Sequence, residues 1–435
     1  MRRFAPVLLA LVIQPQPSCA QAAGTPPPQP TQAESLTVDQ AVELALRDNP
    51  TIRAAQRRVY LAQTKVAPAR ALNDPMLMVR DWGTPLKKPW DLNQAQLMLG
   101  FQQTLTSRDK RDLRGMLAET DARAAADELE SVRQQVAAEV RQLSAALLRN
   151  GDELRLHEDQ ARLLNQAAAA ELASYTTGRS PQTAVLRAQL AVTRLGDHMI
   201  QLQQEGDAAR AELNVLLGRE PASEIAIFGS YGEQRKLPPV DELQRIALAN
   251  RPELANLREQ ITKAADSSRL ARLALKPDYT IAAGYMLMPS GSTYRNGYMA
   301  ELTMNLPRLN RARHDAETAS ADAAAEVSRA ELDARASAIF LEVRQAQLSL
   351  RSAQERARLY HDTLLPQAQA AFKSSTTAYE TAHNDFASVI EAENLLLDIQ
   401  TNYYQSLAAA EVAAAQLERA IGAPLPGTPS ERTSK

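Results

Sequence analysis

Residues 185–218 read VLRAQLAVTRLGDHMIQLQQEGDAARAELNVLLG. Apolar residues or glycine occupy positions 185, 188, 192, 195, 199, 202, 206, 209, 213 and 216, at spacings that alternate between three and four. The same spacing recurs at positions 339, 343, 346, 350, 353, 357, 360 and 364. This heptad pattern is typical of helices that pack as coiled coils. Arg, Glu, Gln and Asp between the seam positions predict that the other helix faces are solvated.

The predicted helices are unusually long. No proline interrupts the chain from Arg108 to Tyr175, and a continuous helix there would span about 100 Å. Aromatic residues make up 4% of the sequence and only 16 residues are glycine. This composition favours long helices over an ordinary globular enzyme domain.

The chain contains two copies of one structural unit, related by offsets of 202 residues at the start and 204 at the end. The copies span 37–220 and 237–424, and 221–236 links them. Asn49-Pro50 corresponds to Arg251-Pro252, and Gly218 to Gly422. Further matches are Asp39 with Asp241, Ala45 with Ala247, Tyr175 with Tyr379, Thr177 with Thr381, Val185 with Val389, and Leu213 with Leu417.

Each copy has the same predicted order of elements. A short amphipathic helix (38–48 and 239–249) precedes a second helix that runs to about Leu72 and Ala274. A β-hairpin follows (76–105 and 279–306), and then a long helical hairpin (107–218 and 311–422). The sequence therefore predicts a mainly α fold with a small β part, consisting of coiled-coil hairpins and four antiparallel strands.

The strand segments alternate between apolar and polar positions. In 95–105, Leu97, Leu99 and Phe101 share one face; the other segments are 76–82, 279–288 and 299–306. Such alternation over about ten residues suits a strand crossing an outer membrane, and equally a half-buried soluble strand. Trp82, Trp90, Tyr294 and Tyr298 lie near the polar loops. Four strands cannot close a barrel, so membrane-spanning strands would require several chains to share one.

The N-terminus resembles a secretory signal. Arg2 and Arg3 precede the apolar segment Val7–Ile13, and Ser18-Cys19-Ala20 offers a cleavage site. We therefore expect a signal peptide at 1–20, an extended leader at 21–36 and a flexible tail at 425–435. Cys19 has a second interpretation as a lipid-carrying cysteine.

Motifs for other functions are missing from the sequence. The net charge of -2 argues against nucleic acid as a partner. There is no phosphate-binding glycine loop, no CxxC and no zinc-like histidine spacing. No apolar stretch of 18 residues follows the N-terminus. We expect neither an enzyme nor a bound cofactor.

The joint order of these motifs resembles the TolC-like outer-membrane factor family over about 37–424. The residues that carry the resemblance are the Asn49-Pro50 and Arg251-Pro252 steps, the Y-x-x-G tip at Tyr175–Gly178 with VLRAQ at Val185–Gln189, and the ending Leu213–Gly218. The tip and Val185–Gly218 look most like members that serve heavy-metal efflux systems.

The resemblance implies an assembly. Three chains would form a 12-stranded barrel in the outer membrane and a periplasmic α-barrel below it. The partners would be a periplasmic adaptor protein and an inner-membrane pump of the RND type. The duct would passively conduct exported metal ions or small toxic compounds to the exterior.

The resemblance also implies site residues at the far end of the helical hairpins. Tyr379, Asp385 and Glu391 match the region of the family's periplasmic gate. The tips that would contact the adaptor are Thr177, Gly178, Arg179 and Ser180 in the first copy, and Thr381, Ala382, His383 and Asn384 in the second. Ala382 departs from the family's usual glycine, which questions the geometry of the second turn.

Three further sets of residues are candidates from chemistry. Met76, Met78, Met286 and Met288 would share a strand face, where thioethers suit Cu(I) or simply fill space. Glu391, Glu393 and Asp398 would form part of a carboxylate ring or a solvated helix face. Asn150 and His157 continue a heptad seam and would fix its register or face a tunnel.

The alternative function is a secreted coiled-coil scaffold without a pore. It accounts for the heptads equally well, but not for four alternating strands at matching points of a duplication. Outer-membrane fractionation separates the two functions, since a scaffold would be extracted without detergent.

Overall fold

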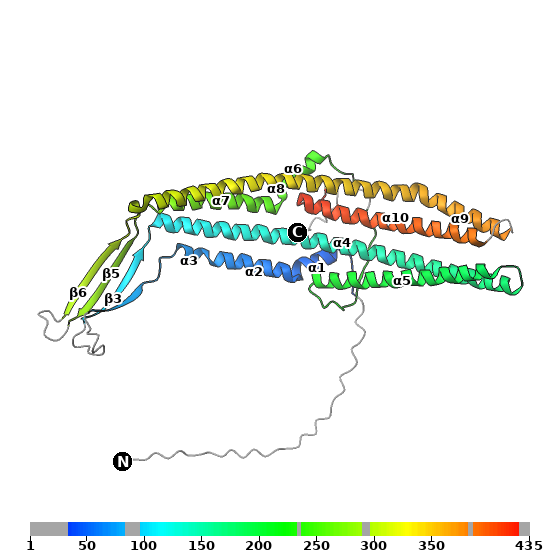
Figure 1. Cartoon of the computed structure of the whole chain (residues 1–435), viewed down its shortest axis with the longest axis horizontal. Helices are drawn as coiled ribbons and strands as arrows, with labels where there is room; N and C mark the ends of the chain where they lie inside the picture. The colour runs from blue at the N-terminus through cyan, green and yellow to red at the C-terminus, as the bar shows by residue number, and fades with distance from the viewer. Residues whose placement is uncertain (1–33, 83–95, 233–235, 289–295, 382–385, 426–435) are drawn as a thin grey trace, which may run out of the picture.

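The computed structural model describes residues 34–82, 96–232, 236–288, 296–381 and 386–425. The molecule is elongated, with a β-sheet at one end and the tips of two helical hairpins at the other (Figure 1). The expected signal peptide, Cys19, most of the leader and the tail lie outside the described residues. So do Trp90, Tyr294, Ala382, His383, Asn384 and Asp385.

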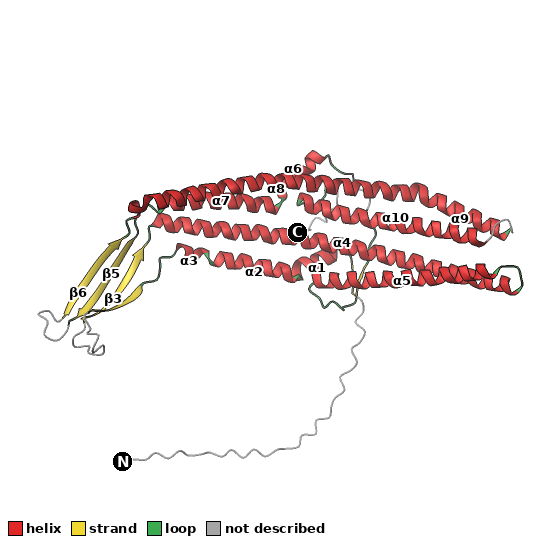
Figure 2. Ribbon diagram, viewed as in Figure 1, coloured by secondary structure: helices red, strands yellow, loops and turns green. Residues whose placement is uncertain are grey.

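The two copies form two parallel sets of elements (Figure 2). The first copy contains α1 (Val38–Asp48), α2 (Pro50–Thr64), α3 (Val66–Arg70), β2 (Met76–Trp82), β3 (Gln96–Leu105), α4 (Arg108–Thr176) and α5 (Gln182–Leu216). The second contains α6 (Val240–Asn250), α7 (Pro252–Leu273), β5 (Tyr279–Leu287), β6 (Asn296–Met304), a 3₁₀ turn (Pro307–Asn310), α8 (Arg311–Leu359), a π-helical segment η2 (Tyr360–Leu364), α9 (Leu365–Glu380) and α10 (Phe386–Ile421). Strands β1 (Glu34–Leu36) and β4 (Ile225–Ile227) pair in parallel. In none of the described ranges is a helix both long and apolar enough to cross a membrane.

Prolines explain where the helices of the two copies differ. The sequence predicts one helix to about Leu72, but it breaks at Lys65 between α2 and α3. Pro68 has no N–H to donate to the Thr64 carbonyl, and its ring collides with that carbonyl. Leu270 stands at the corresponding position of α7, which runs unbroken. Pro366 likewise has no N–H to donate to the Asp362 carbonyl. The helix widens there into the π-helical η2.

The four long strands form one antiparallel sheet in the order β2-β3-β5-β6. The β3–β5 pair joins the two copies, with Leu99 opposite Tyr285. Strand β6 is Asn296–Met304 and not 299–306, so Leu306 lies beyond the sheet. One face carries mainly Leu, Val, Phe, Tyr and Ile, and the other carries Met, Gly, Thr and Gln, as the register shows.

The heptad seams are buried as the spacing predicts. In α5, Val185, Ala188, Leu195 and Leu202 are buried. In α8, every seam position from Ile339 to Ala357 is buried. The two halves have equivalent cores, in which α1 packs with α4 and α5, and α6 with α8 and α10.

A single side chain joins two helix ends in the middle of the molecule. The Asn49 Oδ1 accepts the N–H groups of Thr51 (2.8 Å) and Ile52 (3.1 Å) at the start of α2. Its Nδ2 donates to the Leu216 carbonyl at the end of α5 (2.8 Å). Both helix ends are thereby capped, and α2 continues the path of α5 along α4. We call this contact the first junction.

Arg251 makes the second junction with different chemistry. Its Nη1 donates to the carbonyls of Arg419 (3.1 Å) and Ala420 (3.3 Å) at the end of α10. Its charge is compensated by Glu253 and Glu342, at 2.9 and 3.0 Å. Arg251 is 3% exposed, so these partners are needed to keep the guanidinium inside.

Gly218 and Gly422 complete the two junctions. Both have φ +70, and a Cβ on Gly218 would lie 2.5 Å from the Asp48 carbonyl oxygen. The Arg219 N–H donates to the Asn214 carbonyl at 2.8 Å, which is the Schellman ending of a helix. Glycine is therefore required by both backbone conformation and space.

We predict that Gly218→Ala lowers stability by roughly 1–3 kcal/mol, because it adds left-handed strain and a backbone collision. Gly196→Ala is the matched control, since Gly196 is helical and a Cβ there meets nothing within 4 Å. The control should be neutral or slightly stabilising. Thermal unfolding of the purified protein measures both, and equal unfolding temperatures for the two variants would contradict the prediction.

Candidate functional site at the tips of the helical hairpins

The α4–α5 turn lies at the end of the molecule opposite the sheet (Figure 1). Gly178 has φ +74, its N–H donates to the Tyr175 carbonyl, and the Arg179 N–H donates to the Ser174 carbonyl, both at 2.9 Å. This is the Schellman geometry seen at Gly218. Thr177, Gly178 and Arg179 are exposed and Ser180 is half-buried. In the second tip only Thr381 is described, and it is exposed.

A buried carboxylate connects the two hairpins near these tips. Glu171 of α4 is 3% exposed. Its Oε2 accepts the Ser180 hydroxyl at 2.5 Å, and its Oε1 accepts the Tyr379 hydroxyl of α9 at 3.0 Å. Hydrogen bonds to a charged acceptor are stronger than neutral ones. We call the contact between Glu171 and Tyr379 the latch.

The environment of the latch changes the acidity of the tyrosine. Burial raises the pKa of Tyr379, and the hydrogen bond to Glu171 raises it further. Both effects favour the neutral phenol, which keeps its proton for the Glu171 carboxylate. The neutral Tyr379 phenol is therefore the donor of the latch.

A cavity of about 870 Å³ lies between the hairpins at this level. Arg179, Arg187 and Arg194 line it from the first hairpin, and Tyr379 and Glu391 line it from the second. The three arginines are exposed. The cavity thus has one strongly basic wall, and the latch lies at its edge.

The structure brings two of the three gate candidates together. Tyr379 and Glu391 line the same cavity, whereas Asp385 lies outside the described residues. Glu171 was not among the candidates. The heptad series Asn150, His157, Leu164 and Glu171 is buried throughout, so extending the seam by two heptads from His157 would have found it.

The three carboxylates of α10 do not share one face. Glu391 and Asp398 are exposed, whereas Glu393 is 9% exposed. Burial raises the pKa of Glu393 to about 7. Among the described residues its Oε1 has no hydrogen-bond partner. Glu393 therefore belongs to the packed interior of the hairpin and not to a solvated ring.

The polar seam residues of α4 connect α4 to α5. The Asn150 Nδ2 donates to the Leu202 carbonyl at 2.7 Å, and a Cβ on Gly206 would lie 2.5 Å from the Asn150 Oδ1. The His157 Nδ1 lies 2.8 Å from the Glu153 carbonyl oxygen, and the His157 ring contacts the His198 ring. Asn150 fits only because Gly206 faces it, which indicates a role in helix register.

The candidate methionines lie at the other end of the molecule. Met76, Met78 and Met286 share the face of the sheet that also carries Thr and Gln. Met288 lies one residue beyond β5. Across the described ranges, no group of three or more His, Cys, Asp or Glu side chains is placed to hold a metal ion.

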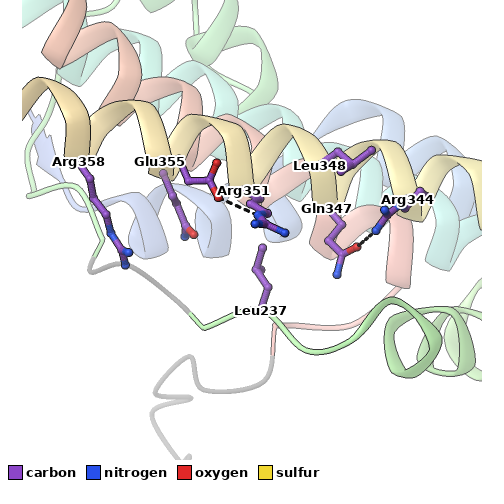
Figure 3. A pocket seen from close by; sticks show the side chains of 8 residues that line it. Leu237, Arg344, Gln347, Leu348, Arg351, Glu355 and Arg358 are labelled. Atoms are coloured by element: carbon purple, nitrogen blue, oxygen red, sulfur yellow. Dashed lines mark hydrogen bonds and ion pairs between the residues drawn. The ribbon is translucent and has the colours of Figure 1, made fainter.

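A smaller pocket of about 330 Å³ lies on the outer face of α8. Arg344, Arg351 and Arg358 line it at seven-residue spacing, with Leu237 opposite (Figure 3). Arg351 donates to Glu355 at 2.8 Å, and Arg344 donates to Gln347 at 2.9 Å. These contacts are typical of a solvated helix face.

Comparisons with known proteins agree with this architecture. A family model described as Outer membrane efflux protein matches residues 243–423. The cobalt-zinc-cadmium resistance protein CzcC of Cupriavidus metallidurans is 24% identical over 432 residues, covering 97% of this chain and 100% of that protein.

Solved structures share the fold. Crystal structures of CusC match with a TM-score of 0.76 at 19% identity, covering 89% of this chain and 92% of that chain. The outer membrane protein VceC of Vibrio cholerae matches with a TM-score of 0.71 at 18% identity, covering 89% of this chain and 96% of that chain. The family match covers the second of two copies with the same elements, and CzcC spans both. Within this chain, residues 243–423 match the outer membrane efflux protein family.

Proposed function

We propose that three copies of this chain form the outer-membrane exit duct of a tripartite efflux system. The observation that carries the proposal is a four-stranded sheet with an exposed apolar face at the end of a helical bundle about 100 Å long. Leu77, Phe101 and Leu302 on that face are 65%, 67% and 69% exposed. A lipid environment would remove the cost of exposing them to water.

The open edges of the sheet support the oligomer. In one chain, β2 and β6 each have a neighbour on one side only. Unpaired backbone groups are not tolerated in lipid, so each β2 would pair with the β6 of a neighbouring copy. Three copies of four strands would then close a 12-stranded barrel, and the long helices would continue it as a periplasmic α-barrel.

The proposed protein partners would bind at the tips of the helical hairpins. A periplasmic adaptor would contact the exposed tip at Thr177, Gly178, Arg179 and Ser180, together with the tip at Thr381–Asn384. The adaptor would connect the duct to an inner-membrane RND-type pump, which supplies the energy. The relative CzcC is named for cobalt, zinc and cadmium resistance, and metal ions are the cargo that we propose. The duct performs no bond-making step.

The latch suggests how the periplasmic end is held closed. The Tyr379 hydroxyl on Glu171 ties α9 to α4, and the cavity lined by Glu391 separates the hairpins beside it. Opening the end requires the two hairpins to move apart, which breaks this hydrogen bond. The basic wall at Arg187 and Arg194 offers an adaptor a surface that would attract its acidic groups.

Membrane fractionation, followed by a mass determination of the detergent-solubilised particle, tests the proposed duct. We expect the protein in the outer membrane as a trimer, because a single sheet cannot satisfy its edges there. Conductance in planar bilayers should accompany the trimer. A monomer or dimer that is soluble without detergent would refute the duct and favour the coiled-coil scaffold.

We predict that Tyr379→Phe raises the conductance of the isolated trimer by roughly tenfold. A hydrogen bond to a charged group contributes about 1.5–3 kcal/mol, and the variant removes it from the closed state only. Tyr175→Phe is the matched control, because Tyr175 occupies the equivalent position of the first copy and is 43% exposed. Conductance that rises equally in both variants, or in neither, would exclude the latch as a gate.

We predict that Glu393 makes stability fall as the pH rises. Its folded pKa of about 7 exceeds the ordinary value of 4.5, so the folded state holds more protons than the unfolded state between these values. The cost of ionising it is on the order of 3 kcal/mol above pH 7. Glu393→Gln should therefore raise the unfolding temperature at pH 8 and change it little at pH 5.

The control for this experiment is Asp398→Asn on the same helix, where the carboxylate is exposed. It should leave the difference between pH 5 and pH 8 as in the unmodified protein. The burial argument fails if Glu393→Gln shows the same gain at both pH values.

A further inference from the structure

The methionines of this chain are concentrated in the sheet. Of the ten methionines, seven lie in the four long strands or within one residue of them: Met76, Met78, Met98, Met286, Met288, Met299 and Met304. The strands are a small part of the chain. A residue that only fills irregular gaps would be expected mainly in the helical cores.

Strand register brings four of these methionines together on one face. Met98 lies directly opposite Met286, in a row that begins at Arg80. The neighbouring row runs from Met78 through two glycines to Met299. Directly opposed residues point to the same face and lie about 5 Å apart, and Met98 and Met286 are such a pair. Met78 and Met299 flank this pair from the outer strands and pack with it in one apolar cluster, so each of the four strands contributes one thioether. We call Met78, Met98, Met286 and Met299 the methionine cluster.

Two glycines provide the space into which the cluster closes. Gly100 and Gly284 lie opposite one another between Met78 and Met299. A Cβ on Gly284 would lie 3.0 Å from the Met98 Cε, so the Met98 methyl lies over this glycine. Met98 is fully buried and Met78 is 9% exposed, whereas Met76 at the margin of the same face is 55% exposed. The side chains therefore converge above the glycines and shield one another from solvent.

The cluster packs with Ala282 and forms a small apolar area on the face of the sheet that also carries Arg, Glu, Gln and Thr. Thr104 and Thr280 contact one another on this face through their hydroxyl groups at 3.2 Å. Arg80 and Glu301 lie across it at 3.6 Å. The opposite face carries the leucines and aromatic residues proposed to face lipid. In the proposed duct this face of the sheet lines a water-filled lumen. It encloses no hydrophobic core, so core packing does not explain why thioethers are buried here.

Thioether sulfur is a soft, uncharged donor. It selects monovalent soft cations of the Cu(I) and Ag(I) class, whereas Zn²⁺ and Co²⁺ prefer imidazole, carboxylate or thiolate ligands. Methionine has three rotatable side-chain bonds, so sulfurs from adjacent strands can approach one ion. The Arg80–Glu301 pair leaves the surroundings of the cluster without a net charge, so the donor chemistry itself decides the selectivity.

We propose that the methionine cluster is a binding site for one soft monovalent cation, Cu(I) or Ag(I), on the inner wall of the barrel. The inner position rests on the proposed duct, in which the apolar face of the sheet meets lipid. The site gives the conduit a point of selective contact near the exit for soft monovalent ions, which it distinguishes from the Zn²⁺ and Co²⁺ for which the relative CzcC is named. A neutral site of this kind holds the ion without a charge of its own, which favours release.

The test is equilibrium binding of Ag⁺ to the full-length protein purified in detergent, against a competing soluble thioether. The test variant carries Met98→Leu and Met286→Leu together, since leucine keeps the volume and removes the donor. The control carries Met116→Leu and Met199→Leu, which make the same change twice within α4 and α5. Cys19, the only cysteine, is the same in every sample.

We expect one Ag⁺ per chain in the unmodified protein and in the control, and an affinity about tenfold or more weaker in the test variant. Zn²⁺ and Co²⁺ binding should not differ among the three. Unchanged Ag⁺ affinity in the test variant would overturn the proposal, and so would an equal loss in the control. Conductance of the same samples tests the duct separately, because a protein that binds Ag⁺ at this cluster but does not conduct refutes only the proposed function.

Discussion

The architecture depends on two places where one residue joins the end of one helix to the start of another. The Asn49 side chain caps both helices, whereas the Arg251 side chain caps only the end of α10. Asn49 and Arg251 each satisfy the carbonyl groups at the end of one long helix, and each immediately precedes the proline that begins another. A helix leaves four N–H groups and four carbonyl groups without partners. Ending two helices inside a packed bundle would therefore be costly without these contacts. Because of them, a short and a long helix form one continuous path along α4 and along α8 (Figure 1).

The junctions also explain why the two copies are similar but not interchangeable. The first uses a neutral amide and the second a buried guanidinium with two carboxylates. The second copy contains the π-helical η2 caused by Pro366, whereas α4 is regular throughout. Tyr379 lies in α9, beyond this irregularity, and reaches a carboxylate of the first copy. The second hairpin therefore has both a weak point in its helix and a breakable contact at its tip, which suits it to movement.

The sheet and the helices differ in which side chains they expose. The helices bury small seam residues and keep charged residues on their outer faces, where ion pairs such as Arg351–Glu355 contribute little to stability. The sheet has the reverse arrangement, with its larger apolar side chains exposed on one face. Its other face combines threonines and an ion pair with the methionine cluster. This inversion within one chain is the physical reason for placing the sheet in lipid and the helices in water.

The sequence by itself determined the periodic parts of this protein. Heptad spacing predicted the buried seams of α5 and α8, alternation predicted the four strands, and the duplication matched Gly218 with Gly422 at the ends of the two copies. It also placed Tyr379 and Glu391 at the hairpin end, through resemblance and not through chemistry. Those features depend on neighbours a few residues apart, whose relative directions follow from helix and strand geometry.

Only the tertiary structure decided which distant residues meet. Glu171 and Tyr379 are 208 positions apart, and no local pattern pairs them. Met98 and Met299 join the methionine cluster through the register of three strand pairs, whereas Met288, which the sequence favoured, lies past the end of its strand. Glu393 and Glu391 differ by two positions on α10, and helix packing buries one and exposes the other. Long-range pairing depends on how whole elements pack, and that information is not contained in any single segment.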